Sequence, residues 1–290
     1  MEVFCNAVYY YIFTLTHSIS EYNLQIQHIA RGYESETREH VLLPKERSLY
    51  TTIVRHPATR FVSAFIYFGH YERMKKGHGG NLTLDNAINL FLDNPKEYKG
   101  SLHRPSWMLG LRRRFPNVTL RGDVRTDGDG LEEQTEQFVQ YLNNEFDLVM
   151  ITERIDESLV VLKEMMGWTV EDILYRKRMV AKTGAVVNST TRERILRYDY
   201  TDLVIYKHFN TKLEMHIDRI GRVRFEQMVK EFTALREEFD KDCTDGTDGP
   251  DNDNSSNQSL ECHFLSRPDV GISKMITSLQ MSDDFTNFTR

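Results

Sequence analysis

The sequence has no long hydrophobic run. Its most apolar terminal stretch, residues 3–15, is too short to cross a bilayer. No basic residue precedes this stretch and no small-residue cleavage site follows it, so it does not match a secretory leader. We therefore expect no membrane anchor within these 290 residues.

Basic residues are not in excess, since 37 Lys and Arg stand against 43 Asp and Glu, for a net charge of −6. This balance argues against nucleic acid as the main partner, although it leaves room for a locally basic pocket that holds an anionic ligand. The ten histidines show no metal-ligand spacing. We therefore predict neither a nucleic-acid partner nor a metal ion.

Cysteine is scarce, with three in the whole chain. Cys243 and Cys262 flank a polar segment and could pair across a short loop, leaving Cys5 over, but all three can equally be free buried thiols. N-glycosylation sequons, by contrast, are dense, and this density favours the lumen of the secretory pathway. The six sequons stand at Asn81, Asn117, Asn188, Asn254, Asn257 and Asn287.

The chain divides most simply into a folded domain over residues 1–243 and a polar tail over 244–290. The tail opens with TDGTDGPDNDNSSNQ, which holds almost no apolar side chain. Such a segment cannot bury enough surface to offset its ordering entropy, so we predict that it is disordered.

Residues 49–68, LYTTIVRHPATRFVSAFIYF, are the stretch around which the chain is organised. The β-rich run of residues 49–54 predicts a strand that stops at Arg55, and Pro57 then suits the first position of a helix with aromatic residues at helical spacing. The Arg55 cation and the N-terminus of the helix would then lie at the same point, which predicts an anion site. The hydroxyl of Ser63 could add a hydrogen-bond donor to this site. Alternatively, Arg55 is solvated or pairs with a carboxylate.

Periodicity predicts further elements along the chain. We expect strands at 22–31 and 146–151, a loop at 70–82 and a loop-rich region at 93–130. The expected helices cover 83–92, 131–143, 155–166, 200–220 and 223–240. Alternating strands and helices predict an α/β fold with a mostly parallel sheet and a helix-rich C-terminal part.

Four ordered stretches resemble the galactose-3-O-sulfotransferase family, which includes galactosylceramide sulfotransferase. They are IVRHPATRFVSAFIYF, FDLVMITERIDESLVVLKEMMGW, VEDILYRK and LVIYKHFNTKLEMHI. The resemblance implies a three-layer, P-loop-like sulfotransferase fold. It also implies transfer of sulfate from PAPS to the 3-hydroxyl of a terminal galactose on a glycolipid or glycan, in the Golgi lumen, by a type II membrane protein.

The resemblance also assigns roles to residues. Arg55 and Ser63 would hold the 3′-phosphate of PAPS, and His28 is the candidate base because HIAR stands where the family has H-[ML]-R-F. A structural histidine is the alternative, and His56 is a weaker candidate. Glu153 would touch the acceptor or the base, or instead form a salt bridge with Arg154 or another neighbour.

The family's loop for the 5′-phosphosulfate, which reads like KTHKTGSST, has no counterpart in these residues, whose first lysine is Lys45. We therefore hold two hypotheses: an N-terminally incomplete enzyme, or a non-catalytic sulfotransferase-like Golgi glycoprotein. A third, an unrelated cytosolic α/β protein with a similar fold, carries less weight.

Overall fold

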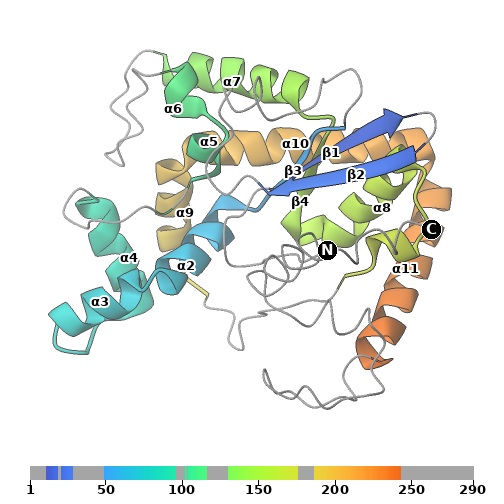
Figure 1. Ribbon diagram of the computed structural model, residues 1–290. Helices are drawn as coiled ribbons and strands as arrows, with labels where there is room; N and C mark the ends of the chain where they lie inside the picture. Colours follow the sequence, from blue (N-terminus) through green and yellow to red (C-terminus); the bar gives the residue numbers. More distant parts are fainter. Residues whose placement is uncertain are drawn as a thin grey trace, which may run out of the picture.

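The computed structural model describes residues 49–95, 102, 104–115, 130–175 and 186–242, together with the backbone of 11–18 and 21–28. Within this part the protein is rich in helices, which surround two small two-stranded sheets (Figure 1). A helix-rich protein with a small parallel sheet is compatible with the α/β class. The three-layer arrangement stays a prediction, and residues 243–290, which include the predicted tail at 244–290, lie outside the described part.

The parallel sheet is formed by β3 (Thr51–Val54) and β4 (Leu148–Ile151). Its register pairs Thr51 with Leu148 and Val54 with Ile151, and every residue of β4 is buried. The Asp147 carboxylate extends the pairing by accepting from the Tyr50 amide at 2.8 Å. The predicted strands at 49–54 and 146–151 are therefore confirmed, with slightly shorter bounds.

Four helices build the main core around this sheet: α7 (Leu131–Glu145), α8 (Ile155–Met166), α10 (Tyr200–Ile220) and α11 (Arg222–Asp242). In Figure 1, α10 runs behind the strands and α8 lies below them, and both contact β4. The Ser158 hydroxyl of α8 accepts the amide of Ile151 at 3.0 Å in the buried interior. All four helices confirm the predicted periodicity, and the break between the last two falls at Gly221, where φ is +94°.

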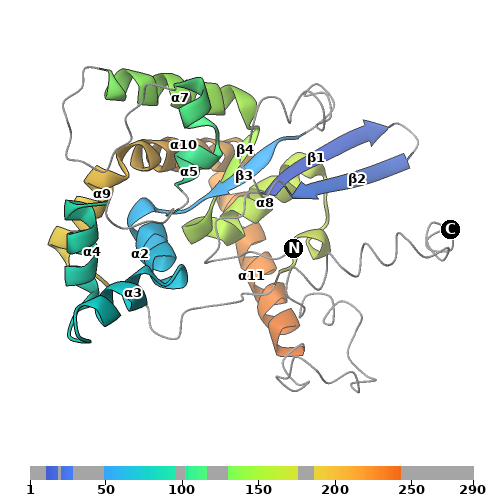
Figure 2. The same cartoon turned by 60° about the vertical axis from the view of Figure 1, so that its left-hand side comes forward.

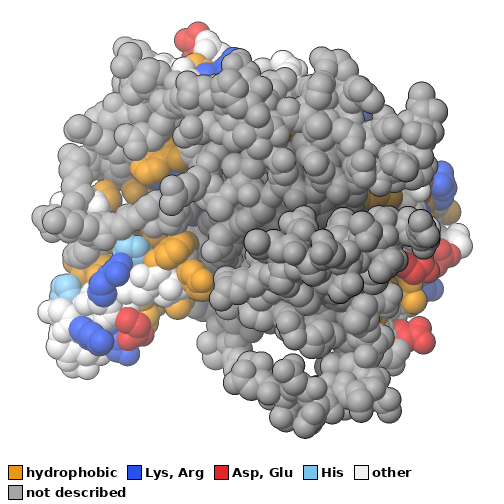
Figure 3. Space-filling model, in the orientation of Figure 1, with side chains coloured by type: hydrophobic (Ala, Val, Ile, Leu, Met, Phe, Trp, Pro, Cys, Tyr) orange, Lys and Arg blue, Asp and Glu red, His pale blue; other side chains and the backbone are white. Residues whose placement is uncertain are grey.

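A second apolar cluster joins α2 (Pro57–Tyr67), α3 (His70–Gly77), α4 (Leu84–Asp93) and α9 (Ser189–Tyr198). Its centre is aromatic, because Phe61 and Phe65 of α2 stack at 5.9 Å and both meet Phe91 of α4 edge-on. Figure 2 shows α2, α3, α4 and α9 gathered to one side of the strands. On the face seen in Figure 3, hydrophobic side chains lie beside Lys and Arg side chains over α2 and α3.

The loop predicted at 70–82 is wrong over its first half, because residues 70–77 form α3. The helix begins after Gly69, whose φ of +69° turns the chain, and it buries only His70 and Met74. Two buried positions are too few to produce a visible apolar period. The predicted loop-rich region likewise contains two single-turn helices, α5 (Pro105–Met108) and α6 (Leu111–Arg114).

A buried ionic network ties the two clusters together. Arg60 of α2 and Arg104, just before α5, both pair with Asp199, at 2.6 and 2.9 Å. Asp202 of α10 accepts the Ser106 amide at 2.8 Å. Since isolated charges are costly in the interior, this balance of two guanidinium and two carboxylate groups is what makes their burial tolerable. The network thereby fixes the orientation of α2 relative to α10.

An antiparallel hairpin of β1 (Tyr11–Ser18) and β2 (Glu21–His28) completes the described part. The predicted strand at 22–31 is thus confirmed, over a shorter range. β1 lies alongside β3, and Figures 1 and 2 both show the end of β2 directed toward the parallel sheet. Among the helices of the described residues, none combines the length and the apolar character needed to span a membrane.

Candidate anion site at the ends of the parallel strands

The candidate site lies where β3 and β4 end side by side. Arg55 directly follows β3, and Glu153 lies two positions beyond β4. Two residues that are 98 positions apart in the sequence therefore lie together at one edge of the sheet. The helix α2 begins at Pro57, immediately past this edge. The crevice at the carboxyl ends of parallel strands is where open α/β sheets bind their ligands.

The Glu153 carboxylate is the centre of the site. It accepts the His56 amide at 3.0 and 3.2 Å, and its Oε1 lies 3.0 Å from the Thr59 hydroxyl. Arg55 Nε lies 4.0 Å away, and the Glu153 side chain is 33% exposed. His56 is the N-cap of α2 but makes no side-chain capping bond. Glu153 therefore caps α2 from the segment that follows β4, where the helix dipole favours an anion.

Two residues of α10, one turn apart, hold the short helix η2 (Thr152–Arg154) that carries Glu153. Burial first, and then the charge and hydrogen bond of Glu153, raise the pKa of the Tyr206 phenol. The Asn210 side chain accepts from Arg154 Nη1 at 3.2 Å. The segment 206–210, YKHFN, therefore lies beside both residues that follow Thr152, and its Asn210 holds Arg154.

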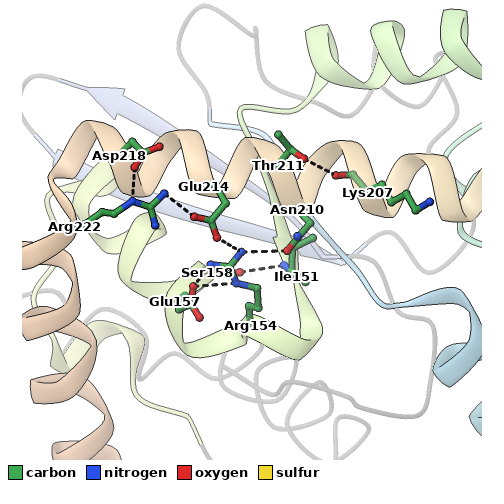
Figure 4. Close-up of polar contacts among 10 residues, drawn as sticks. All are labelled: Ile151, Arg154, Glu157, Ser158, Lys207, Asn210, Thr211, Glu214, Asp218 and Arg222. Atoms are coloured by element: carbon green, nitrogen blue, oxygen red, sulfur yellow. Dashed lines mark hydrogen bonds and ion pairs between the residues drawn. The ribbon is translucent and has the colours of Figure 1, made fainter.

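Figure 4 shows Arg154 in polar contact with residues of α8 and α10. Its guanidinium pairs with Glu157 and, at 2.6 Å, with Glu214, which also binds Arg222 at 2.9 Å. The sequence left open a salt bridge of Glu153 with Arg154 or another neighbour, and of these Arg154 is not the partner. The partner of Glu153 is Arg55, and Arg154 serves to fix η2.

His56 lies on the other flank of the turn. Its ring meets Tyr206 edge-on at 5.1 Å, and its Nε2 lies 3.4 Å from Arg192 Nη2 of α9. Burial and the Arg192 charge lower the pKa of His56, and the opposing effect of Glu153 is smaller. Because an ordinary histidine pKa is already below 7, the imidazole is neutral at neutral pH.

The site therefore gathers groups that suit an anion: a guanidinium from Arg55, an amide from His56 and hydroxyls from Thr59 and Tyr206. A phosphate oxygen uses the same kinds of donor. Nothing in the described residues resembles a metal centre, because no group of three or more His, Cys, Asp or Glu side chains is placed to hold one.

Comparison with known proteins supplies the family. The model of the galactose-3-O-sulfotransferase family matches residues 7–261, which is most of the chain. The chain belongs to the galactose-3-O-sulfotransferase family. No solved structure gives a significant match.

Named relatives agree with this. Mouse galactosylceramide sulfotransferase is 27% identical over 229 residues, covering 78% of this chain and 51% of its own length. Mouse galactose-3-O-sulfotransferase 3 is 28% identical over 211 residues, covering 70% and 46%, and human galactose-3-O-sulfotransferase 2 is 26% identical over 202 residues, covering 68% and 47%. The chain thus spans about half the length of the sulfotransferases that it matches.

Among the residues that the family resemblance assigned, Arg55 lies at the predicted place and contacts Glu153. Ser63 lies on α2, about two turns beyond the strand end, and is partly exposed. His28 is the last residue of β2 and pairs with Tyr11 across the hairpin, while its side chain lies outside the described part. The phosphate-binding and base roles stay predictions.

Two of the sequons fall in the described part, and both stand at helix starts. Asn81 is exposed two residues before Thr83, the N-cap of α4. Asn188 is itself the N-cap of α9, where its side chain accepts the Thr191 amide at 2.8 Å. The remaining predicted modification sites lie outside the described residues: Asn117, Asn254, Asn257, Asn287, Cys243 and Cys262.

Sequence reasoning missed three members of the site. Thr59 and Tyr206 stand inside stretches that carried the resemblance. Tyr206 and Asn210 are four residues apart and share one face of a helix, so this spacing could have indicated that both face the site. Arg192 had no such signal, because it comes from α9, a polar helix that periodicity did not reveal.

Proposed function

We propose that this chain belongs to a galactose 3-O-sulfotransferase and that its β3–α2 turn holds the 3′-phosphate of the sulfate donor PAPS. The observation that carries the proposal is the convergence of the Arg55 guanidinium and the His56 amide at the N-terminus of α2, in a member of this family. Ser63, farther along α2, supplies a further hydroxyl to the phosphate. The names of the relatives support galactose as the sugar that is modified.

In the proposed reaction, the 3-hydroxyl oxygen of a terminal galactose forms a bond to the sulfur of PAPS. The bond from sulfur to the phosphate oxygen breaks, and adenosine 3′,5′-bisphosphate leaves with that electron pair. A base takes the hydroxyl proton, and His28 is our candidate, since histidine titrates near neutral pH. The protein's part in such a transfer is mainly to align donor and acceptor and to balance charge.

The acceptor is a galactose-terminated glycolipid of the galactosylceramide type, or a glycan, and the chain works in the Golgi lumen. The exposed sequon at Asn81 supports a luminal location. A transfer assay with radiolabelled PAPS, offered galactosylceramide or a galactose-terminated oligosaccharide, tests the activity and separates the two acceptors. Binding of nucleotide without transfer would favour the non-catalytic hypothesis.

Calorimetric titration with adenosine 3′,5′-bisphosphate tests the donor site directly. We expect binding by the wild type and at least a tenfold loss in Arg55→Ala, because a phosphate contact through arginine is charge-assisted. Arg224→Ala is the matched control, since Arg224 is an exposed arginine of α11 that pairs with Glu164. Equal binding by all three proteins, or binding by none, would overturn the proposed site.

A further inference from the structure

The donors that suit a phosphate at the β3–α2 turn already hold an anion that belongs to the protein. Glu153 takes up the single N–H of His56, lies within hydrogen-bond distance of the Thr59 hydroxyl and faces Arg55. An amide N–H cannot serve a second acceptor equally well at the same time. A phosphate can therefore use these donors fully only when the carboxylate has moved.

We propose that the Glu153 carboxylate is a built-in occupant of the β3–α2 turn, that nucleotide phosphate binds by displacing it, and that Glu153 thereby limits how tightly the nucleotide is held. This rests on the proposed function, which places the 3′-phosphate at the turn. The carboxylate and the phosphate are both anions, so they compete for the donors and also repel each other when close.

The surroundings of Glu153 allow its side chain to move while its backbone stays. A third of the side chain is exposed, so the carboxylate reaches solvent by rotation. The hydrogen bonds of Arg154 to Glu157 and Asn210, and its ion pair with Glu214, hold η2 through residues of α8 and α10, as Figure 4 shows. Tyr206, whose pKa the Glu153 charge helps to raise, lies near the carboxylate, and it belongs to α10 rather than to the turn.

Displacement gives Glu153 a role in turnover as well as in binding. When the nucleotide leaves, the carboxylate returns to the His56 amide and recaps α2, so the empty site does not keep an unsatisfied helix terminus. An internal anion that replaces a departing anion lowers the cost of release. The residue is thus a determinant of nucleotide affinity and residence time, and it takes no part in bond making.

The test measures binding of adenosine 3′,5′-bisphosphate and of adenosine 5′-monophosphate to wild type, Glu153→Gln and Glu164→Gln. Glutamine keeps an oxygen for the His56 amide but removes the charge, so we expect Glu153→Gln to bind the bisphosphate about tenfold tighter and to release it more slowly. Binding of the monophosphate, which lacks the 3′-phosphate, should not change. Glu164→Gln controls for general charge, because Glu164 is also partly exposed but pairs with Lys163 and Arg224, away from η2.

Equal or weaker bisphosphate binding by Glu153→Gln, while Arg55→Ala still abolishes binding, overturns this inference and leaves the proposed function standing. An equal gain in Glu164→Gln also overturns it, because the effect would then be one of overall charge. No binding by any variant overturns both proposals. Should the glutamine variant fail to fold, Glu153→Asp replaces it, since its shorter carboxylate withdraws from the His56 amide and should also tighten binding.

Discussion

At the scale of single residues, Thr83 has two separable roles. Its hydroxyl caps α4 by accepting the Asn86 amide at 3.2 Å, and it also completes the sequon that begins at Asn81. Capping hydroxyls of this kind stabilise a helix by about 1 kcal/mol. The glycan site and the helix start therefore share one side chain.

We predict that Thr83→Ala lowers the free energy of unfolding by about 1 kcal/mol and abolishes any glycan at Asn81. Thr83→Ser should preserve both properties, and Asn81→Gln should lose the glycan alone. Chemical denaturation of unglycosylated protein and mass spectrometry of secreted protein make the two measurements. Full stability in the alanine variant would show that the cap contributes nothing.

At the scale of elements, one tyrosine of the family stretch VEDILYRK reinforces the contact between α8 and α11, whose Asp156 and Arg236 also pair directly at 3.5 Å. The Tyr175 hydroxyl donates to Asp156 at 2.6 Å and accepts from Arg236 at 3.2 Å. Burial, together with the Asp156 carboxylate, raises the pKa of this phenol well above its ordinary value. Asp156, in the family stretch FDLVMITERIDESLVVLKEMMGW, thus helps to join α8 to α11.

Tyr175→Phe should destabilise the protein by about 2 kcal/mol, because it leaves Asp156 and the buried Arg236 without their shared partner. Tyr206→Phe, a loss of the same atom at the anion site, is the comparison and should cost less, since that ring is more exposed. Urea denaturation of the three proteins measures both changes. A larger loss in the Tyr206 variant would contradict the prediction.

The link between α2, α5 and α10 is sensitive to pH. Burial and the neighbouring Asp199 raise the pKa of Asp202 to about 6, against the opposing influence of Arg60 and the hydrogen bond from Ser106. Between about pH 4 and pH 6 the folded protein therefore holds a proton that the unfolded chain has lost. The free energy of unfolding consequently falls as the pH rises through this window.

Asp202→Asn keeps the oxygen that accepts the Ser106 amide but cannot ionise. Relative to wild type, we expect this variant to gain on the order of 3 kcal/mol between pH 4 and pH 7. Asp218→Asn, which changes an exposed residue of the same helix, should show a much smaller change. Denaturation curves at several pH values give the comparison, and a constant difference across the range would refute the prediction.

At the scale of the whole molecule, two apolar clusters are joined by the Arg60, Arg104 and Asp199 network. Both tryptophans, Trp107 and Trp168, pack against the main core, whereas the second cluster contains neither. Tryptophan fluorescence therefore reports one cluster, and substitutions of Phe61 perturb the other. This separation makes the cooperativity of the molecule measurable.

We predict that Phe61→Ala destabilises the protein by about 4 kcal/mol, because it empties a fully buried aromatic site between α2 and α4. Since the ionic network couples the clusters, the fluorescence transition and the helical circular dichroism transition should shift together. A fluorescence midpoint that stays in place while the dichroism midpoint falls would show two independent units.

Sequence reasoning recovered the features whose signal is local. The strand, turn and helix around Arg55, and the long helices of the main core, follow from short-range periodicity and from proline and glycine placement. Helices α3 and α9 were missed because each buries only two residues. The partner of Arg55 was left open. The choice of Glu153 depends on how β3 and β4 align across the long connection between them, and no local pattern encodes that alignment.

The long connection between β3 and β4 has a kinetic consequence. The contacts between Tyr50 and Asp147 and between His56 and Glu153 each span 97 residues, so the anion site does not exist until this long segment has folded back and the two strands have aligned. Closing such a loop costs entropy before any pairing rewards it, and folds dominated by distant contacts form slowly. The site is therefore among the last features to form during folding, and no fragment that contains only one of the two strands can reproduce it.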